Sequence, residues 1–445
     1  YRQGKHSDPR KPKRESHSSV IVPCRRRYTL PLMNLHQTTL SNGIRVVAEP
    51  IPTVQSLTVS LWIRVGSRDE LPHQHGIAHF LEHMLFKGTH TRSAAQIAQA
   101  VEGRGGVLNA STGKELTFYY ARMLAEHMPI AVEVLSDLFL NARLDPQDIE
   151  LEKGVILEEM RMIEDTPDEI LHDRATEVHW GAHPLARRII GTPETVSAFT
   201  RAAILEFTRA HYRPERVVVA AAGNLDPDAL FGEVDRWLGS WRPDSDAEPP
   251  AAQPPPMRDP NAPPRLLEPR AVEQTHFALV MDGVSFFDER RYTQAVLNTL
   301  LGGSMFSRLW QEVREKRGLA YEIGSYAAPM SDGGLFVIYG GVAPSAFEQA
   351  VQVIEAELQT LIDAPPDEAE VENARNLLKG NRVLALESTQ NRAELIGSET
   401  LMRGAVTPME AILAQIDAVT PERLHALTQQ LFAPERRTLV ALTPA

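Results

Sequence analysis

The sequence predicts an α+β fold: two homologous α+β domains of about 200 residues each, joined by a Pro-rich linker and facing each other across a cleft. Three observations predict it. Helical and β-rich stretches are mixed in both parts of the 445-residue chain, a proline-rich segment lies near the middle, and the order of elements repeats. With 43% hydrophobic residues, the chain can bury a large core.

The linker is expected at residues 242–264, RPDSDAEPPAAQPPPMRDPNAPP. Proline and polar residues are concentrated there, without apolar periodicity, which is typical of an extended connection. It separates an N-terminal domain, residues 33–241, from a C-terminal domain, residues 265–445.

The two domains resemble each other in sequence. The first ends with HYRPERVVVA and the second with LFAPERRTLV, so Pro214 and Pro434 correspond at an offset of 434 − 214 = 220 residues. The same offset approximately relates two other pairs: LTVSLWIRV (57–65) with THFALVMDGV (275–284), and a helix at 148–164 with one at 368–384. This shared order indicates an internal duplication.

Within each domain we expect a strand pair, one or two helices, further strands, longer helices and a closing strand. SNGIRVVAEP carries a turn followed by a strand, and Ser93 is a suitable N-cap for the helix SAAQIAQAVEG, with Gly103 near its end. The aromatic and β-branched run LTFYYARML (116–124) predicts a strand.

The composition excludes several classes of protein. A net charge of −12 argues against general binding of nucleic acid, since that requires Lys and Arg that neutralise phosphates. The single cysteine, Cys24, rules out an intrachain disulfide. No run approaches the roughly 18 to 20 apolar residues of a membrane span. We expect a cytoplasmic protein, with a periplasmic or organellar location as the alternative.

Residues 1–32 differ in composition from the rest, with nine Lys or Arg against two acidic residues. We interpret them as a basic leader outside the fold. A transit peptide is one explanation, and an extension before a natural start at Met33 is the other. A role for this leader in binding nucleic acid or a membrane surface would require it to be necessary for function.

The motif GIAHFLEHMLFKGT (76–89) contains candidate catalytic and metal-binding residues. His79, Glu82 and His83 are spaced i, i+3 and i+4, so on a helix they share one face. They could be ordinary polar residues of a half-exposed helix. Alternatively, two imidazoles one turn apart bind zinc and Glu82 takes a proton from the attacking water, in the inverted form of the His-Glu-x-x-His motif.

Catalytic zinc usually has three protein ligands. Candidates for the third lie in DPQDIELEKGVILEEMRMI (145–163), where a helix starting near Pro146 puts Glu152 and Glu159 on one stripe with two isoleucines. Glu158 falls off this stripe. The alternative for both carboxylates is a solvated acidic face.

These two segments resemble the pitrilysin or insulinase family of zinc peptidases, in particular the short-chain branch that contains the mitochondrial processing peptidase. The resemblance runs from about Met33 to the end. In that family the third ligand follows the second histidine by about 76 residues, and 159 − 83 = 76, which selects Glu159. Glu152 matches a second acidic position that supports the site without being a primary ligand.

The resemblance implies further site residues. Arg314 and Tyr321 match an Arg and a Tyr seven residues apart, which would bind substrate carbonyls and stabilise the tetrahedral intermediate. Without the family they are a helix-surface charge and a strand residue, and Arg317 lies close by.

Two further segments resemble parts of the family's substrate cleft. Asn109 and Ala110 match a segment where an extended peptide can add as a strand, a mode that suits broad preference. A turn is the other interpretation of Asn109. The glycine-rich run LGGSM (301–305) resembles a loop that handles substrate.

The duplication supplies a comparison within the chain. Shifted by 220, Glu159 falls on Lys379, and the motif falls on residues 299–303, which hold no histidine. We therefore expect one Zn²⁺ per chain, held by the first domain.

Together these observations predict a zinc metalloendopeptidase that hydrolyses peptides or unfolded protein segments. The resemblance implies a homodimer, or a heterodimer with a related subunit. The competing hypothesis is a non-catalytic structural or partner subunit, because the family also contains subunits that lack the metal residues.

Overall fold

The computed structural model describes residues 33–242 and 253–445. The expected basic leader, with Cys24, and residues 243–252 of the expected linker lie outside these ranges. We refer to the two described ranges as the first and second halves.

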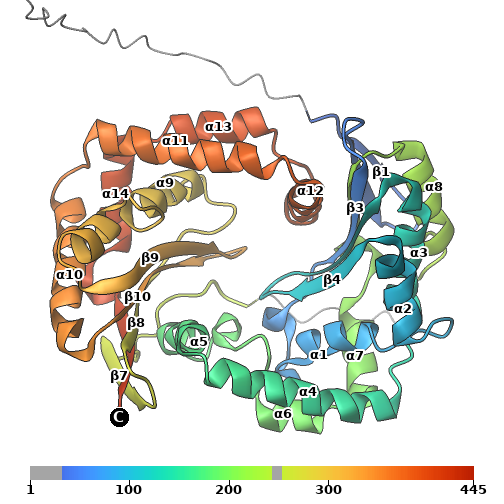
Figure 1. Cartoon of the computed structure of the whole chain (residues 1–445), viewed down its shortest axis with the longest axis horizontal. Coiled ribbons are helices and arrows are strands. Elements are labelled where there is room, and N and C mark those ends of the chain that lie inside the picture. Colours follow the sequence, from blue (N-terminus) through green and yellow to red (C-terminus); the bar gives the residue numbers. More distant parts are fainter. Residues whose placement is uncertain (1–32, 243–252) are drawn as a thin grey trace, which may run out of the picture. The chain divides into compact units, whose positions relative to one another are not determined.

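The strands of the first half form one sheet in the order β1-β2-β6-β3-β5-β4 (Figure 1). Its strands are β1 (His36–Thr39), β2 (Arg45–Pro50), β3 (Ser56–Ile63), β4 (Val107–Thr112), β5 (Thr117–Leu124) and β6 (Val217–Gly223). β2 and β6 are parallel, and the other neighbours are antiparallel. β4 therefore lies at one edge of the sheet.

The strands of the second half form a sheet in the order β7-β11-β8-β10-β9. They are β7 (Arg265–Arg270), β8 (Thr275–Asp282), β9 (Ala320–Pro329), β10 (Gly334–Val342) and β11 (Thr438–Pro444). The one parallel pair in this sheet is β7 with β11.

The two sheets have the same topology once β1 is set aside. β2-β6-β3-β5-β4 corresponds strand by strand to β7-β11-β8-β10-β9, including the position of the parallel pair. This agreement confirms the predicted α+β fold built by internal duplication. The predicted strands at 57–65, 116–124 and 275–284 are β3, β5 and β8.

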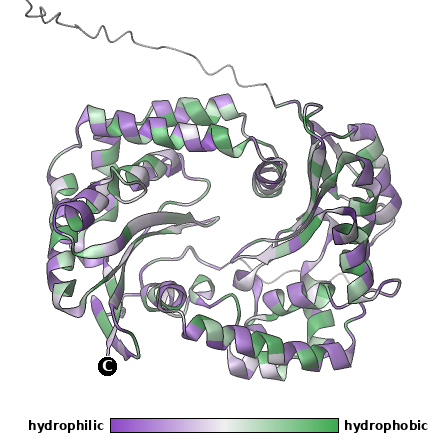
Figure 2. Cartoon of the chain, viewed as in Figure 1, coloured by the Kyte–Doolittle hydropathy of each residue, from purple (hydrophilic) through white to green (hydrophobic). Residues whose placement is uncertain are grey.

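Helices cover both sheets. In the first half they are α1 (Ile77–Leu85), α2 (Ala94–Val101), α3 (Met128–Asn141), α4 (Pro146–Glu164), α5 (Pro167–Trp180), α6 (Pro193–Ala198), α7 (Arg201–His211) and α8 (Pro227–Leu238). In the second half they are α9 (Arg291–Leu301), the π-helical segment η7 (Trp310–Glu315), α10 (Phe347–Asp363), α11 (Glu368–Ala385), α12 (Thr389–Arg403), α13 (Met409–Asp417) and α14 (Pro421–Leu431). Many of them carry hydrophobic and hydrophilic residues side by side, as amphipathic helices do (Figure 2).

Two corresponding helices are exchanged between the halves. α12 of the second half packs on β3 and β6 of the first sheet, where Ile396 is buried against Trp62 and Val218. In return, α5 packs on β8 and β11 of the second sheet, where Ile170 and Leu171 are buried. Each half thus completes the apolar core of the other.

Local signals explain where the two helices that matter most for the site begin. Gly76 adopts a left-handed conformation, φ 95°, directly before α1. The Asp145 side chain accepts a hydrogen bond from the Gln147 backbone amide, and Pro146 occupies the first position of α4. Both helices pack against each other beside the edge strand β4.

Candidate metal centre

The inverted motif lies on α1, whose apolar face determines which way its polar residues point. Phe80, Leu81, Met84 and Leu85 are buried in the main core of the first half. The remaining face presents His79, Glu82 and His83. The two imidazole rings lie edge to face, with ring centroids 4.6 Å apart.

Glu159 on α4 meets both imidazoles. His79 Nε2 lies 3.8 Å from Glu159 Oε1, and His83 Nε2 lies 3.7 Å from Glu159 Oε2. Ligand atoms of these three side chains all lie within 4.8 Å of one another, and no other group of His, Cys, Asp or Glu in the described residues is arranged in this way. The geometry brings together the three residues predicted as metal ligands.

The donor set fits zinc. Two nitrogens and one carboxylate oxygen are a common catalytic zinc set, and donors at about 2.0–2.1 Å from a tetrahedral ion stand about 3.3 Å apart. The two separations between a histidine nitrogen and a Glu159 oxygen exceed this by about half an ångström. Moreover, Glu159 Oε2 and His79 Nδ1 are buried atoms without a hydrogen-bond partner among the described residues. An unpartnered buried carboxylate oxygen is costly unless a cation or donor binds it.

Burial controls the charge of the ligands. Burial, with a smaller contribution from the neighbouring His83, lowers the pKa of His79 to about 4, so His79 is neutral at pH 7 and its nitrogen lone pair is free. Burial also raises the pKa of Glu159; the charge of His83 opposes this shift, and the charges of Glu152 and Glu169 add to it. A bound cation would reverse that shift.

Glu152 lies behind His83 and orients it. Its side chain is almost fully buried, and its Oε1 lies 2.9 Å from His83 Nδ1. Lys87 forms an ion pair with the other oxygen. Burial raises the pKa of Glu152, but the bonds from His83 and Lys87 outweigh it, and the net shift is downward. Nδ1–H donation to a carboxylate leaves Nε2 of His83 facing Glu159.

Glu82 connects the motif to the edge strand β4. Its Oε2 accepts a hydrogen bond from the hydroxyl of Thr112, the last residue of β4. Burial raises the pKa of Glu82, partly opposed by this hydrogen bond. A raised pKa makes a carboxylate a better proton acceptor, as a general base requires.

Asn109 and Ala110 lie in the middle of β4, so Asn109 is a strand residue and not part of a turn. They pair with Tyr120 and Tyr119 of β5. The backbone amide of Ala110 donates to the side-chain oxygen of Asn109, at 2.9 Å. In the described residues β4 has no strand partner on its other side, which leaves that side open to strand addition.

Arg314 and Tyr321 lie together in the second half. The Arg314 guanidinium stacks 4.0 Å from the Trp310 ring centroid and 5.0 Å from that of Tyr321. Tyr321, on β9, is 79% exposed. In the described part of the chain, no hydrogen bond or ion pair joins either residue to the three candidate ligands, so their assigned roles stay predictions.

One residue that positions the site was not expected. Glu70 is 4% exposed, and its carboxylate accepts hydrogen bonds from the backbone amides of Gly76 and Ala78, at 2.8 and 2.9 Å. It therefore holds the first turn of α1, the helix that carries two ligands. An acidic residue seven positions before a helix offers no periodic signal, so sequence reasoning missed it.

Comparison with known proteins agrees with this geometry. The family model described as Insulinase (Peptidase family M16) matches residues 45–193, and the model of the peptidase M16 inactive domain matches residues 198–378.

No helix in the described residues combines the length and apolar character needed to cross a membrane.

Among curated proteins, the chain is 39% identical over 407 residues to a Bacillus subtilis protein named as the uncharacterized zinc protease YmxG, covering 92% of this chain and 98% of the relative. It is 40% identical over 415 residues to a Streptomyces coelicolor protein named as an uncharacterized zinc protease, covering 92% of this chain and 90% of the relative.

Solved structures share the fold. A protease from Helicobacter pylori superimposes with a TM-score of 0.85 at 23% identity, covering 93% of this chain and all of that one. An M16-like peptidase from Alicyclobacillus acidocaldarius superimposes with a TM-score of 0.82 at 23% identity, covering 94% of this chain and 99% of that one. With two matching family models and near full-length relatives, the chain belongs to the insulinase family of peptidases, peptidase family M16.

Proposed function

We propose that the chain is a zinc-dependent endopeptidase that hydrolyses peptides or unfolded protein segments. The observation that carries the proposal is the convergence of His79, His83 and Glu159, with a buried oxygen of Glu159 lacking a protein partner. The relatives named as zinc proteases support the choice of metal.

His79, His83 and Glu159 would hold the ion. A bound zinc ion acts as a Lewis acid, which lowers the pKa of water and polarises a peptide carbonyl. Glu82 then takes the proton of the attacking water at its carboxylate and returns it to the leaving amine, while its hydrogen bond to Thr112 keeps the carboxylate in place.

The substrate would be bound as an added strand beside Asn109 and Ala110. Because Thr112 of the same strand contacts Glu82, a peptide paired with β4 runs close to the general base. Arg314 and Tyr321 are proposed to bind the carbonyl oxygen on which negative charge develops.

Substitution of Glu82 by Gln tests this proposal. The variant should bind about one zinc per chain, as the wild type does, but lose cleavage of a quenched-fluorescent peptide by roughly 10²-fold to 10⁴-fold, the usual contribution of a general base. Glu159→Gln is the matched control, since it should lose zinc as well.

Two results would change the assignment. If the wild type holds zinc and is silent by itself, a missing partner chain becomes the next hypothesis. The predicted dimer would then be tested by light scattering and by adding candidate subunits. A wild type that binds no zinc after reconstitution contradicts the peptidase and favours the non-catalytic subunit.

A further inference from the structure

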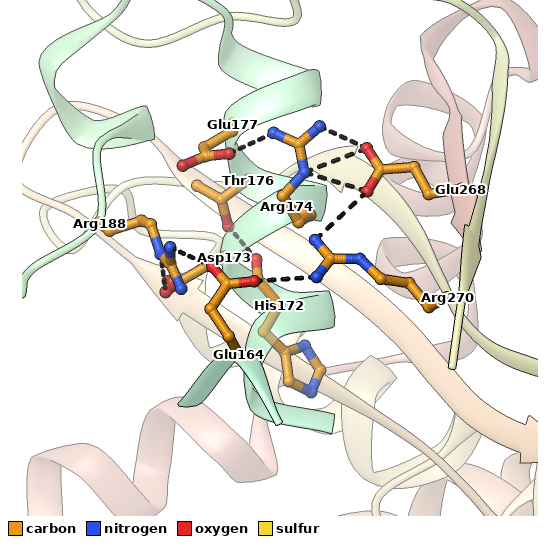
Figure 3. A network of polar contacts seen from close by, with 9 residues as sticks. All are labelled: Glu164, His172, Asp173, Arg174, Thr176, Glu177, Arg188, Glu268 and Arg270. Carbon is orange, nitrogen blue, oxygen red and sulfur yellow. Dashed lines mark hydrogen bonds and ion pairs between the residues drawn. The ribbon is translucent and has the colours of Figure 1, made fainter. Parts of the chain in front are cut away.

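The loop that follows α5 makes contact with both helices that carry candidate zinc ligands. Arg188 lies in this loop and belongs to the polar network drawn in Figure 3. Its main chain contacts His75, two residues before α1, and its side chain contacts Glu164 at the end of α4. No residue of this network was singled out from the sequence.

The main chain of this loop is in close contact with His75 and Gly76, the two residues directly before α1. His75 Nε2 lies 2.7 Å from the Arg188 carbonyl oxygen, and because a carbonyl only accepts, this nitrogen donates. Gly191, with φ 86°, packs against Gly76 at the helix start; a Cβ on Gly191 would lie 2.5 Å from the His75 carbonyl oxygen. This close packing leaves the loop no room to move toward α1.

The side chain of Arg188 reaches α4 and α5. Its Nη1 donates to Glu164 Oε1 at 2.7 Å, and its Nε donates to Asp173 Oδ2 at 3.1 Å. The Arg188 side chain is 14% exposed. Glu164 is the last residue of α4, and 164 − 159 = 5 positions correspond to about 7.5 Å along the helix from Glu159.

The second half is connected to the same carboxylate. Glu164 Oε2 accepts a hydrogen bond from Arg270 Nη1 of β7 at 2.9 Å, so one carboxylate bridges two arginines, one from each half (Figure 3). Beside it, Arg174 of α5 pairs with Glu268 of β7. The end of α4 is therefore held from both sides.

We propose that Arg188 is a positioning residue of the metal centre: it sets α4, with Glu159, relative to α1, with His79 and His83, and Arg270 of the second half completes the clamp through Glu164. This inference rests on the proposed zinc site. It assigns the second half a part in building a metal centre whose ligands all belong to the first half.

The physical reason is the repulsion that Arg188 removes. Without its guanidinium, the carboxylates of Glu164 and Asp173 lose the cation that lies between them. The end of α4 can then move away from the loop, and Glu159 moves with it. Metal ligands must be held within about 0.5 Å of their productive positions, so a small helix displacement weakens binding.

The test measures the metal site directly in the full chain. The Zn²⁺ dissociation constant is determined by chelator competition, and the visible absorption of the Co²⁺-loaded protein reports ligand geometry. The variants are Arg188→Ala, Arg188→Lys, Arg270→Ala and the double variant Arg188→Ala/Arg270→Ala. Arg161→Ala is the matched control, because Arg161 also lies on α4 and pairs with Glu158 in an exposed position.

Arg188→Ala should weaken Zn²⁺ binding about 10-fold or more, as removal of residues that orient metal ligands does, and change the Co²⁺ absorption band. Arg188→Lys, which keeps the charge without the fork, should lie between it and the wild type. Arg270→Ala alone should cause a smaller loss of Zn²⁺ affinity. In the double variant it should add nothing to the loss caused by Arg188→Ala, since both arginines act through Glu164. Arg161→Ala should match the wild type.

The proposal is overturned if folded Arg188 variants retain the wild-type Zn²⁺ constant and Co²⁺ spectrum, or if Arg161→Ala weakens binding equally. Thermal unfolding identifies any variant that does not fold. If Arg188→Ala does not fold, the Zn²⁺ constants of Arg188→Lys and Glu164→Gln test the same contact between Arg188 and Glu164. A wild type that binds neither metal overturns the proposed function and this inference together, whereas a wild type that binds both and variants that bind normally overturn the inference alone.

Discussion

Glu70 shows how one buried side chain determines the position of a functional helix. The backbone amides at the start of a helix have no acceptor within the helix. The Glu70 carboxylate accepts hydrogen bonds from two of them, those of Gly76 and Ala78. Burial raises the pKa of Glu70 to about 8, although the two amide donors oppose the shift. The site thus depends on a carboxyl group whose charged form is disfavoured.

Glu70 makes stability depend on pH. Because the folded state binds the proton more tightly, the contribution of Glu70 is complete below its ordinary pKa of 4.5 and is lost as the pH rises through 8. Within that window the wild type should lose up to about 1.4 kcal/mol of unfolding free energy per pH unit from this group. Glu70→Gln, which imitates the neutral acid, should remove this slope.

The measurement is urea unfolding at several pH values for both proteins. His211, whose pKa burial lowers to about 4, gives a slope of opposite sign between pH 4 and 6.5, so the difference between wild type and variant is the relevant quantity. Equal slopes in both proteins would contradict the assignment to Glu70.

At the scale of elements, the exchanged helix α12 depends on a glycine. Gly397 is buried where α12 crosses β3, and a Cβ there would lie 2.2 Å from Trp62 Nε1. The indole cannot move away easily, because it stacks on Phe118 at 4.2 Å and donates to Ser60 Oγ. Glycine is required here for close approach of helix and sheet.

Gly397→Ala should therefore destabilise the protein by about 1–3 kcal/mol, the usual cost of inserting a carbon into a packed core. The matched control is Gly380→Ala in α11, where an added Cβ meets nothing within 4 Å. That change should stabilise by about 0.5–1 kcal/mol, since alanine is the better helix former. Equal effects of both changes on urea unfolding would show that α12 tolerates a looser contact.

At the scale of the whole molecule, polar contacts join the two halves beside the exchanged helices. Arg68 of the first half donates to Asp332 in the β9–β10 turn and to Glu115. Glu115 also accepts from the backbone amide of Ser331. The Arg68 side chain is 13% exposed, so the ion pairs are only partly screened.

Arg68→Ala should destabilise the protein by about 2–3 kcal/mol, because it leaves Glu115 and Asp332 facing each other without a cation. Arg236→Ala, which removes an exposed pair with Glu233, should change stability by less than about 1 kcal/mol. Calorimetry of the two variants measures both changes in stability. An Arg68 variant as stable as the wild type would show that these ion pairs do not stabilise the contact between the two halves.

Much of this architecture could be predicted from local patterns. The spacing of His79, Glu82 and His83 is a property of one helix, and the alternation and turn residues of the strands are properties of short segments. The duplicated order of elements was visible as an offset of 220 residues, and the sheet topologies confirm it. Glu159 required the family spacing, since α4 carries several carboxylates.

By itself, therefore, the sequence determined the elements, their duplication and the residue types of the candidate metal centre, because these depend on periodicity and near neighbours. Only the tertiary structure decided that α5 and α12 are exchanged, that Glu70 caps α1, and that Arg188 and Arg270 meet on Glu164. The physical reason is that these contacts join residues far apart in the chain, where no repeat or spacing records which partners the packing will bring together.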